Sequence, residues 1–535
     1  MGDQENTIDV KDQRAIRIAK LNKLIDAGIN PYPAEIDSDR DQISSVRAKF
    51  DELKRITDDK GQVTKHGSIV YLAGRIMALR YHGKSMFGTI CDGSGEFQLY
   101  FRKNILEENM TDFKEPFEMA KDLDIGDFIA ARGEVFSTHT GEPTLLVNSW
   151  QLISKTLLPL PEKYHGLTDP DLRIRQRYLD LIANPEVKSN FMKRAIIVRT
   201  IRNYLEDQGY VEIETPALTP LYGGAAARPF ITHHNALDMK LYLRIATELY
   251  LKRLIVGGFE KVYELGKVFR NEGLDRDHNP EFTLLELYEA YSDYRGMMAI
   301  SEGIVMSCAK AVAEFVAQND DESEEKYIRI KGENAVEIDY EDETIVIEPP
   351  FEKMPYMELL EKYTGIDFSE ENIEKAKDYL KENKIEFEKT ASYWDLIDKI
   401  FSEAVEPNLK QPVFVIDYPL AISPLAKRKP GHENITERFE LFMFSREMAN
   451  AFSELNDPLD QRERMEKQME NMQEWQIGDK ILDEDFLTAL EHGMPPTGGL
   501  GIGVGRLVTI LSGVHALKEI IAFPLYKPKP QEDQA

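Results

Sequence analysis

The chain has 535 residues, 42% of them hydrophobic, and a formal net charge of −28 at pH 7. This length predicts two or three domains, no uncharged apolar stretch reaches the roughly 18 residues of a membrane helix, and the polar N-terminus lacks the apolar centre of a secretory signal. Two cysteines, Cys91 and Cys308, provide neither a disulfide framework nor a metal cluster, so we expect a reducing, cytoplasmic compartment.

Residues 12–27 predict an amphipathic helix that Asp12 can cap and that ends at Gly28. Four basic residues at a spacing of three form a stripe along it: Arg14, Arg17, Lys20 and Lys23. A stripe of this kind is either a solvated helix face or a surface that contacts RNA. The sequence leaves both readings open.

From about 66 to 154 the pattern changes to five short strands of alternating polarity, separated by turn signals such as DGSG and HTGE. Five strands in so short a stretch predict a small closed barrel, and an OB-fold is the best candidate. That fold presents aromatic side chains to single-stranded nucleic acid.

A Pro- and Gly-punctuated stretch around 158–170 indicates a linker. Beyond it, helices alternate with apolar strands to the C-terminus. The section from about 319 to 405 is highly charged, and we expect it to be a mostly helical insertion into the larger domain.

Two segments combine strands with turn residues. In 209–234, after a predicted helix at 190–207, a strand stops at Pro216 before a Gly-Gly pair, which alone is weak evidence of function. In 261–294, two strands flank a polar loop, with Arg270 at a strand end and carboxylates inside apolar strands. Burying those carboxylates costs several kcal/mol unless each has a partner, which argues against a plain surface hairpin.

Two further segments suggest anion and cation sites. In 498–511, alternating glycines lead to Arg506 at the start of a helical pattern, where backbone, helix dipole and guanidinium can approach an anion. In 437–457, alternation favours a strand through Glu440, and Glu447 follows it. Two carboxylates beside a triphosphate are what Mg²⁺ sites require.

Taken together, these segments resemble the class II lysyl-tRNA synthetases over roughly residues 66–530. The similarity lies in TPALTPLYGGAAARPFITHH, FRNEG with HNPEFT, and GLGIGVGRL, supported by SPLAKR, FSELND and TALEHGMPPT. The resemblance implies an α+β multidomain protein: a helical extension (1–65), an OB-fold anticodon-binding barrel (66–155), a linker (156–175) and a class II catalytic domain (176–535) that contains the insertion. No GxGxxG or Walker loop competes with this interpretation.

The resemblance also implies the reaction, in which ATP activates lysine to an adenylate and the enzyme then transfers lysine to the 3′ end of tRNA(Lys). The expected partners are ATP, L-lysine, tRNA(Lys) and up to three Mg²⁺ ions, in a homodimer formed through the first signature near Pro216. The implied catalytic and ATP-binding residues are Arg270, Glu272, His278, Phe282 and Arg506, with Glu440 and Glu447 for the metal. The implied lysine-binding residues are Gly224, Glu248, Glu286, Tyr288, Asn450 and Glu454.

The choice of lysine also has a physical argument. A lysine ammonium taken out of water needs anionic partners, and Glu286 and Glu454 supply them, whereas an aspartate pocket would need a basic group. The rival interpretation of Glu286 is that it is only a structural ion-pair partner. For the whole chain, the rival functions are an aspartyl- or asparaginyl-type enzyme, a protein-lysylating relative without the barrel, and a non-catalytic RNA-binding relative.

In the barrel, the resemblance places Phe87 and Gln98 at positions that contact anticodon bases, with Arg75 and Glu142 as further candidates. Phe87 as ordinary barrel core is the rival interpretation. Because the chain is acidic overall, RNA must be held by local basic patches, and we expect modest affinity that falls steeply with salt. One departure from the family pattern is Gly505, where an Asp usually precedes the third-signature arginine and could orient it.

Overall fold

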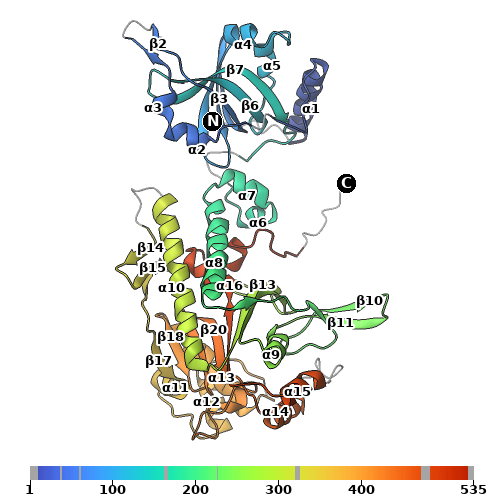
Figure 1. Ribbon diagram of the computed structural model, residues 1–535, viewed down its shortest axis with the longest axis vertical. Coiled ribbons are helices and arrows are strands. Elements are labelled where there is room, and N and C mark those ends of the chain that lie inside the picture. The colour runs from blue at the N-terminus through green and yellow to red at the C-terminus, as the bar shows by residue number, and fades with distance from the viewer. Residues whose placement is uncertain are drawn as a thin grey trace, which may run out of the picture. The chain divides into compact units, whose positions relative to one another are not determined.

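The computed structural model describes residues 10–36, 39–58, 62–161, 167–225, 227–319, 326–388, 390–470 and 482–527. The chain forms two compact units, Met1–Thr168 and Asp169–Ala535 (Figure 1). Parts of the predicted linker (162–166) and of the predicted insertion (320–325 and 389) lie outside the described residues, as does Ala226 in the first signature. The finer division into an extension, a linker and an insertion stays a prediction.

The first unit is built on a closed five-stranded barrel, as the alternating pattern predicts. Its strands follow the order β3-β4-β5-β7-β6. They span Ile69–His82 (β3), Ser85–Cys91 (β4), Glu96–Arg102 (β5), Phe128–Ser137 (β6) and Pro143–Ser154 (β7). Along β4 and β5 every second residue is buried, because successive side chains of a strand point to opposite faces. One face therefore fills the barrel and the other faces outward.

Short elements surround this barrel. They are α1 (Val10–Asp26), α2 (Ile43–Ala48), α3 (Phe50–Leu53), the β1–β2 ribbon (Ile56–Thr57 and Val63–Lys65), α4 (Lys103–Asn109) and α5 (Pro116–Ala120). Gly28 follows α1 with φ +85, a conformation that favours glycine. Asp12 lies within the first turn of α1, so the prediction that Asp12 caps the helix is wrong.

The basic stripe of α1 packs largely on its own unit. Arg17 is buried and donates to Thr156 Oγ1 at 2.7 Å, and Lys20 pairs with Asp124. Lys23 pairs with Asp122. Three of the four stripe residues thus hold the helix through ion pairs and hydrogen bonds. Arg17 and Lys20 are thus largely covered by their own unit, whereas Lys23 stays mostly exposed, and contact of the stripe with RNA stays a prediction.

The second unit contains an eight-stranded sheet of order β17-β18-β19-β20-β21-β13-β12-β8. Its inner pairs are antiparallel, and the two outermost pairs, β17–β18 and β8–β12, are parallel. The central strands are β12 (Lys261–Phe269), β13 (Glu281–Ala290), β19 (Arg438–Met443), β20 (Arg446–Ser453) and β21 (Thr497–Gly503). The outer strands are β8 (Val211–Glu212), β17 (Glu352–Pro355) and β18 (Val413–Ile416).

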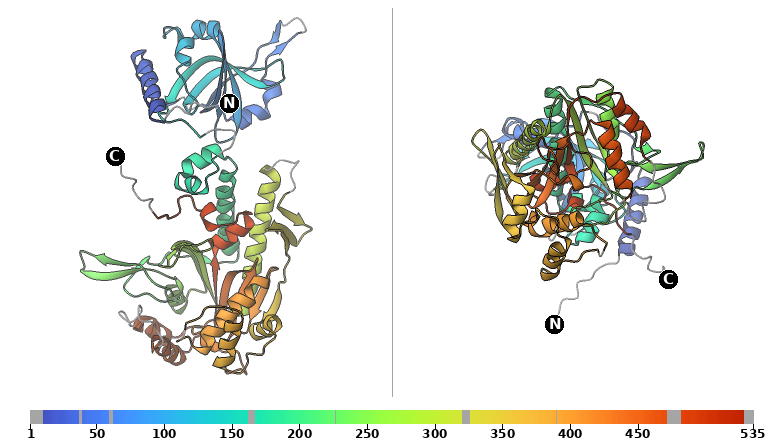
Figure 2. Two further views of the ribbon diagram at one scale, coloured as in Figure 1. Left: turned by 180° about the vertical axis from the view of Figure 1, so that it is seen from behind. Right: turned by 90° about the horizontal axis from the view of Figure 1, so that it is seen from below.

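The two faces of this sheet are covered differently. On one face, Leu285 and Leu287 of β13 join a large core with α8 (Val187–Asp207), α10 (Tyr294–Asn319) and α16 (Val504–Leu511). On the other face, Tyr288 packs with Leu251 of α9 (Glu248–Val256) and with α15 (Glu484–Glu491). Figure 2 shows the sheet and its helices from two further sides. The polar side chains of β13, β19 and β20 that are predicted for function, among them Glu286, Glu440 and Asn450, belong to this second face.

The remaining helices of the unit are α6 (Pro170–Arg175), α7 (Arg177–Ala183), α14 (Pro458–Glu470) and the 3₁₀ turns Glu406–Asn408, Leu420–Ile422 and Leu517–Glu519. Strands β9 (Leu218–Thr219), β10 (Ile231–His234) and β11 (Met239–Leu243) form a separate small sheet, whose β10–β11 hairpin projects from the unit (Figures 1 and 2).

The predicted insertion is helical only in its second half. Its helices α11 (Tyr356–Thr364), α12 (Ile373–Glu382) and α13 (Tyr393–Ala404) share one core. Before them, β14 (Ile328–Lys331), β15 (Ala335–Tyr340) and β16 (Glu343–Ile347) form an antiparallel sheet. The alternation in this stretch places Val336 and Ile338 in the core and charged residues outside, and the density of charge concealed that pattern.

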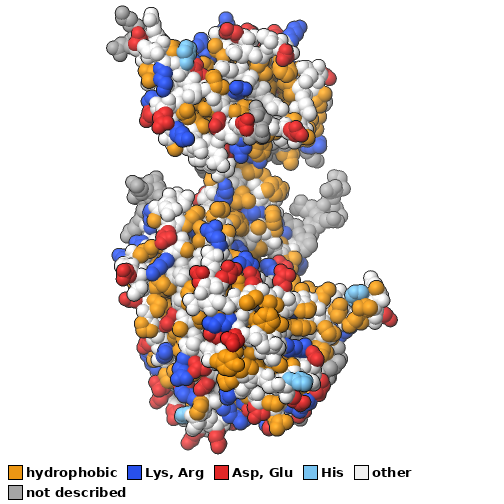
Figure 3. Space-filling view, in the orientation of Figure 1, with side chains coloured by type: hydrophobic (Ala, Val, Ile, Leu, Met, Phe, Trp, Pro, Cys, Tyr) orange, Lys and Arg blue, Asp and Glu red, His pale blue; other side chains and the backbone are white. Residues whose placement is uncertain are grey.

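None of the described helices combines the length and apolar character needed to cross a lipid bilayer. On the face drawn in Figure 3, acidic and basic side chains are intermixed over both units. The excess of acidic residues is therefore spread over this face rather than collected in one patch.

Candidate active site

A row of cross-strand partners runs across the centre of the sheet. Glu286 on β13 pairs with Gly501 on β21, Gly501 with Asn450 on β20, and Asn450 with Glu440 on β19. Directly paired residues point to the same face of a sheet. Three segments far apart in the sequence therefore place Glu286, Asn450 and Glu440 side by side on the face opposite α8 and α10.

The glycines of β21 form the floor of this row. Gly499 pairs with Tyr288 on one side and with Phe452 on the other. A Cβ atom at Gly499 would overlap Glu454 Oε1 and the ring of Tyr288. The absence of a side chain at 499 thus leaves the space that these two groups occupy, which explains the glycine-rich strand.

Glu286 is 7% exposed and forms, with the buried Glu248 and Glu454, a cluster of carboxylates that we call the acidic pocket. Its Oε2 accepts hydrogen bonds from the Thr247 backbone N–H at 3.0 Å and the Thr247 hydroxyl at 2.6 Å. Burial, with repulsion from Glu248, raises the pKa of Glu286 to about 7, against the opposing effect of the Thr247 bonds. A cation beside Glu286 would recover the free energy that its burial costs.

Glu454 is the second buried carboxylate of the pocket, at 1% exposed. Its Oε2 forms an ion pair with Lys252, while its Oε1 has no hydrogen-bond partner among the described residues. Burial raises the pKa of Glu454 although Lys252 opposes the shift. An unsatisfied buried carboxylate oxygen is a ready partner for an incoming ammonium group.

Gly224 and Glu248 lie close together. Gly224 has φ +83, and a Cβ atom there would lie 3.1 Å from Ala246 Cβ and 3.3 Å from Glu248 Cβ. The glycine therefore lets the 221–225 loop approach the start of α9 closely. Glu248 is buried and bonds to Lys252.

Arg270 and Phe282 lie together where β12 and β13 meet the loop between them. The Arg270 guanidinium carbon lies 5.2 Å from the centre of the Phe282 ring. Arg270 Nε donates to the Ile245 carbonyl at 3.4 Å. Glu272 is exposed on the loop that follows. The geometry provides a flat aromatic surface beside a guanidinium, which suits a nucleotide base next to its phosphates.

His278 and Arg506 meet although 228 residues separate them. Arg506 Nη2 lies 3.4 Å from His278 Nε2, and His278 Nδ1 lies 2.8 Å from Asp275 Oδ2. An arginine only donates, so Nε2 accepts and the ring proton sits on Nδ1, facing Asp275. Arg506 also donates to the Glu447 carbonyl at 2.8 Å and to its carboxylate at 3.3 Å.

These contacts show what orients Arg506 in a chain that has Gly505 in place of the usual aspartate. Arg506 is oriented by Glu447 and His278 rather than by a preceding carboxylate. A Cβ atom at 505 would lie 2.9 Å from Leu517 Cδ2, so the glycine lets the start of α16 pack against the Leu517 turn.

Glu440 and Glu447 form the carboxylate pair next to Arg506. The β19–β20 register shifts between Leu441 and Phe442, so that Phe442 pairs with Glu447 and Met448 has no partner. This bulge turns Glu447 toward the face that carries Glu440. Burial, then repulsion from Glu447, raises the pKa of Glu440. A divalent cation would relieve both effects.

Three polar side chains at the site were not predicted from the sequence. Arg438 pairs with Glu440 and donates to Asn450 Oδ1 at 3.2 Å, and its position two residues before Glu440 on the same strand was the available signal. The pKa of Glu406 is raised to about 8 by burial and by repulsion from Glu440 and Glu447. The third is Lys252, one helical turn after Glu248.

In the barrel unit, Phe87 stacks on Tyr100 with ring centres 4.4 Å apart, and Tyr100 lies 6.1 Å from Phe136. Phe87 is half-buried on the outer face, between the buried Met86 and Gly88, so the interpretation that it is barrel core is wrong. Gln98 shares this face and accepts a bond from the Thr144 hydroxyl at 2.9 Å.

The other two candidates in the barrel, Arg75 and Glu142, make their contacts outside this aromatic stack. Arg75 packs over Phe128 at 4.2 Å and donates to the Gly126 carbonyl, and burial lowers its pKa. Glu142 is exposed and lies 3.8 Å from Arg47. The structure thus groups Phe87 and Gln98 with a shared exposed surface, whereas Arg75 is engaged in holding the barrel.

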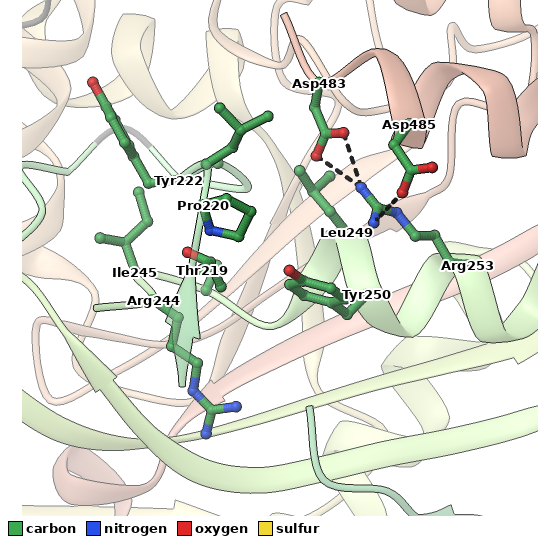
Figure 4. Close-up of a pocket in the computed structure, with 13 residues that line it drawn as sticks. Thr219, Pro220, Tyr222, Arg244, Ile245, Leu249, Tyr250, Arg253, Asp483 and Asp485 are labelled. Atoms are coloured by element: carbon green, nitrogen blue, oxygen red, sulfur yellow. Dashed lines mark hydrogen bonds and ion pairs between the residues drawn. The ribbon is translucent and has the colours of Figure 1, made fainter. Parts of the chain in front are cut away.

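A cavity of about 110 Å³ lies beside α9 (Figure 4). It is lined by the 219–223 and 244–246 segments, by Leu249, Tyr250 and Arg253, and by Asp483 and Asp485. Arg253 forms ion pairs with both aspartates. Glu248 and Lys252, one turn apart, belong to the pocket, and Leu249 and Arg253 line the cavity, so the two spaces flank different sides of α9.

An antiparallel sheet that carries arginines, paired carboxylates and a glycine floor, together with a nucleic-acid-binding barrel, defines a class II aminoacyl-tRNA synthetase. The family model of class II tRNA synthetases for D, K and N matches residues 169–527, and the model of the OB-fold nucleic acid binding domain matches residues 70–153.

Comparison with curated relatives shows which family of class II synthetases the chain resembles. Lysine–tRNA ligases of Carboxydothermus hydrogenoformans and Moorella thermoacetica are each 46% identical, over 96% and 97% of this chain and 98% and 99% of their own lengths. The lysine–tRNA ligase of Thermoanaerobacter pseudethanolicus is 46% identical over 98% of both chains. The chain belongs to the lysine–tRNA ligase family.

Proposed function

We propose that the protein activates L-lysine with ATP to lysyl-adenylate and transfers the lysyl group to the 3′ end of tRNA(Lys), releasing diphosphate and AMP. The observation that carries the choice of amino acid is the pair Glu286 and Glu454. Both carboxylates are buried, neither pairs with an arginine in the described structure, and Glu454 Oε1 lacks a hydrogen-bond partner there. A long cationic side chain satisfies both groups, while an aspartate side chain would be repelled.

The residues fit the two ends of the amino acid. Glu286, Tyr288 and Glu454, with Asn450 beside them, surround the side-chain ammonium. Gly224 and Glu248 receive the α-ammonium group, which the close approach of Gly224 to Glu248 supports. The α-carboxylate then faces Arg270, the cation whose charge acts on Glu286.

Adenylate formation is an in-line attack of the lysine carboxylate oxygen on the α-phosphorus of ATP. The P–O bond to diphosphate breaks as the new bond forms, so the protein has to position the reactants and neutralise charge. Arg270 holds the α-phosphate and the carboxylate, and Phe282 stacks on adenine while Glu272 accepts from its amino group. Arg506 and His278 face the β- and γ-phosphates, which their mutual contact supports.

Glu440 and Glu447 are the residues that would hold Mg²⁺. Among the described residues there is no group of three His, Cys, Asp or Glu able to form a metal site alone, which fits an ion bound by two carboxylates together with phosphates and water. The raised pKa of Glu440 fits this role, because a cation relieves repulsion between the two groups. Bound there, Mg²⁺ neutralises charge on the triphosphate.

The remaining partners follow from the same family. The half-buried aromatic stack around Phe87, with Gln98 on the same outer face, offers a surface for anticodon bases, and Arg75 and Glu142 are further contacts. A homodimer through the first signature near Pro216 would cover exposed apolar side chains, among them Leu218 at 50% and Ile231 at 59% exposed. The two cysteines are free thiols, which suits the reducing cytoplasm.

Amino-acid-dependent ATP–diphosphate exchange tests this function. Lysine should support exchange, and aspartate and asparagine should not. Arg270→Ala should abolish exchange while the variant keeps the wild-type melting temperature, because Arg270 acts on the reacting groups. Exchange with aspartate alone, or near-wild-type exchange by a folded Arg270→Ala variant, would refute the assignment.

A further inference from the structure

Lys252 is a fully buried lysine inside the amino-acid pocket. It stands one helical turn after Glu248 on α9, and its Nζ donates to Glu248 Oε1 at 2.5 Å. The same Nζ forms an ion pair with Glu454 Oε2. Its side chain is 0% exposed, and Nζ lies 5.9 Å and 5.5 Å from the ring centres of Tyr288 and Phe452. The protein thus places its own ammonium group between two carboxylates assigned to the substrate.

The charges of the pocket make this placement informative. Three carboxylates, Glu248, Glu286 and Glu454, face one another closely enough to repel, since Glu248 and Glu286 both act on Glu454. Lys252 reduces this charge from three negative to two. Free lysine brings two ammonium groups, and its carboxylate faces Arg270. With Lys252 in place, the charges of pocket and substrate match, an inference that rests on the proposed function.

We propose that Lys252 is a positioning residue for substrate lysine. It favours the ionised form of Glu454 and holds its Oε2 in an ion pair, so that the unpartnered Oε1 is left to receive the side-chain ammonium of the substrate. Gly499 is consistent with separate roles for the two carboxylate oxygens, because the absence of a side chain at this position leaves space for Glu454 Oε1. Without the Lys252 charge, Glu454 would take up a proton and present a neutral acid to a cationic substrate.

A purely structural ion pair between α9 and Glu454 would give a different experimental result. Removing a structural pair destabilises the fold and lowers activity regardless of substrate. Removing a positioning charge raises the KM for lysine selectively, because Glu454 then takes up a proton more readily and its Oε2 is no longer held. The ionisable groups that face Lys252 are Glu248 from α9, Glu286 and Tyr288 from β13, and Glu454 after β20.

The experiment compares Lys252→Met and Lys252→Gln in the full-length enzyme by ATP–diphosphate exchange between pH 7 and 9. The matched control is Lys261→Met, which removes another ion-paired lysine, 2.8 Å from Glu289 and outside the site. We expect the KM for lysine to rise about tenfold or more over this pH range, as for the loss of one charge interaction worth a pKa unit or more. The KM for ATP should change less than about twofold.

An unchanged KM for lysine in a folded variant, or a loss shared equally by lysine and ATP, overturns the proposal. So does the failure of both variants to fold while Lys261→Met folds, because Lys252 would then be needed for folding. These outcomes are distinct from failure of the proposed function, which wild-type enzyme reveals by its choice of amino acid.

Discussion

At the scale of single residues, the pKa of Glu286 predicts how lysine binding depends on pH. The pKa is raised to about 7 by burial and by repulsion from Glu248, so the ionised form that attracts an ammonium group dominates only above that pH. Its contribution to binding is present at pH 8 and is lost as the pH falls below 7. We expect the KM for lysine to rise as pH falls from 8 to 6, approaching tenfold per unit below the pKa.

The measurement is lysine-dependent exchange across this pH range, with the KM for ATP as the internal reference. Glu286→Gln removes the titrating group, so its KM for lysine should be higher at pH 8 and flatter with pH. An equally steep profile in that variant would assign the titration to another group, with Glu454 the next carboxylate to consider because burial raises its pKa too.

Many of the side chains that the structure brings together at the candidate site could be predicted from single residues, and Lys252 shows why the others could not. Arginines and carboxylates in apolar strands signal function because their burial is costly. Lys252 follows Glu248 at the i+4 spacing, which on an exposed helix indicates an ordinary surface pair. Only the three-dimensional structure shows that this turn of α9 is buried against Glu454.

At the scale of elements, β21 acts through the side chains it lacks. Gly499→Ala would drive a methyl group into Glu454 and Tyr288, whereas Gly501→Ala would place its methyl no closer than 3.8 Å to the Asn450 carbonyl. We expect Gly499→Ala to lower the melting temperature by several degrees, as overpacking costs about 1–3 kcal/mol. Gly501→Ala should leave it within a degree or so.

Thermal melting of the two variants checks this, with lysine added to saturation in a second series. Gly499→Ala should also lose most of the stabilisation that lysine gives to wild type, because Glu454 moves. Equal melting temperatures for the two variants would mean that β21 yields easily at 499 and that its glycines serve another purpose.

Helices and strands could be predicted from the sequence where the period of the hydrophobic residues agreed with the positions of the turn residues. The barrel, the strand that ends just before Arg270 and the strands through Glu286 and Glu440 follow from alternation. The sheet at 328–347 was not predicted. Its outward-facing positions are mostly charged, and this high charge content concealed the alternation of hydrophobic residues that is typical of strands. The stripe on α1 remained ambiguous because its partners, Asp122 and Asp124, lie about a hundred residues away.

At the scale of the whole molecule, the net charge of −28 sets the conditions for holding RNA. A tRNA must approach against repulsion and bind through local cations, whose contacts release counterions. Lysine activation involves only small ligands and does not depend on those contacts. The KM for tRNA(Lys) should therefore rise about tenfold or more between 50 and 200 mM KCl, while the KM for lysine in exchange changes little.

Aminoacylation and ATP–diphosphate exchange, measured with the same enzyme sample over this range of KCl, test whether salt raises the KM for tRNA(Lys) without raising the KM for lysine. A parallel rise of both KM values would indicate that salt acts on the catalytic unit itself rather than on RNA binding. A tRNA KM independent of salt would mean that stacking on surfaces such as the one around Phe87 supplies most of the affinity, because stacking releases few counterions.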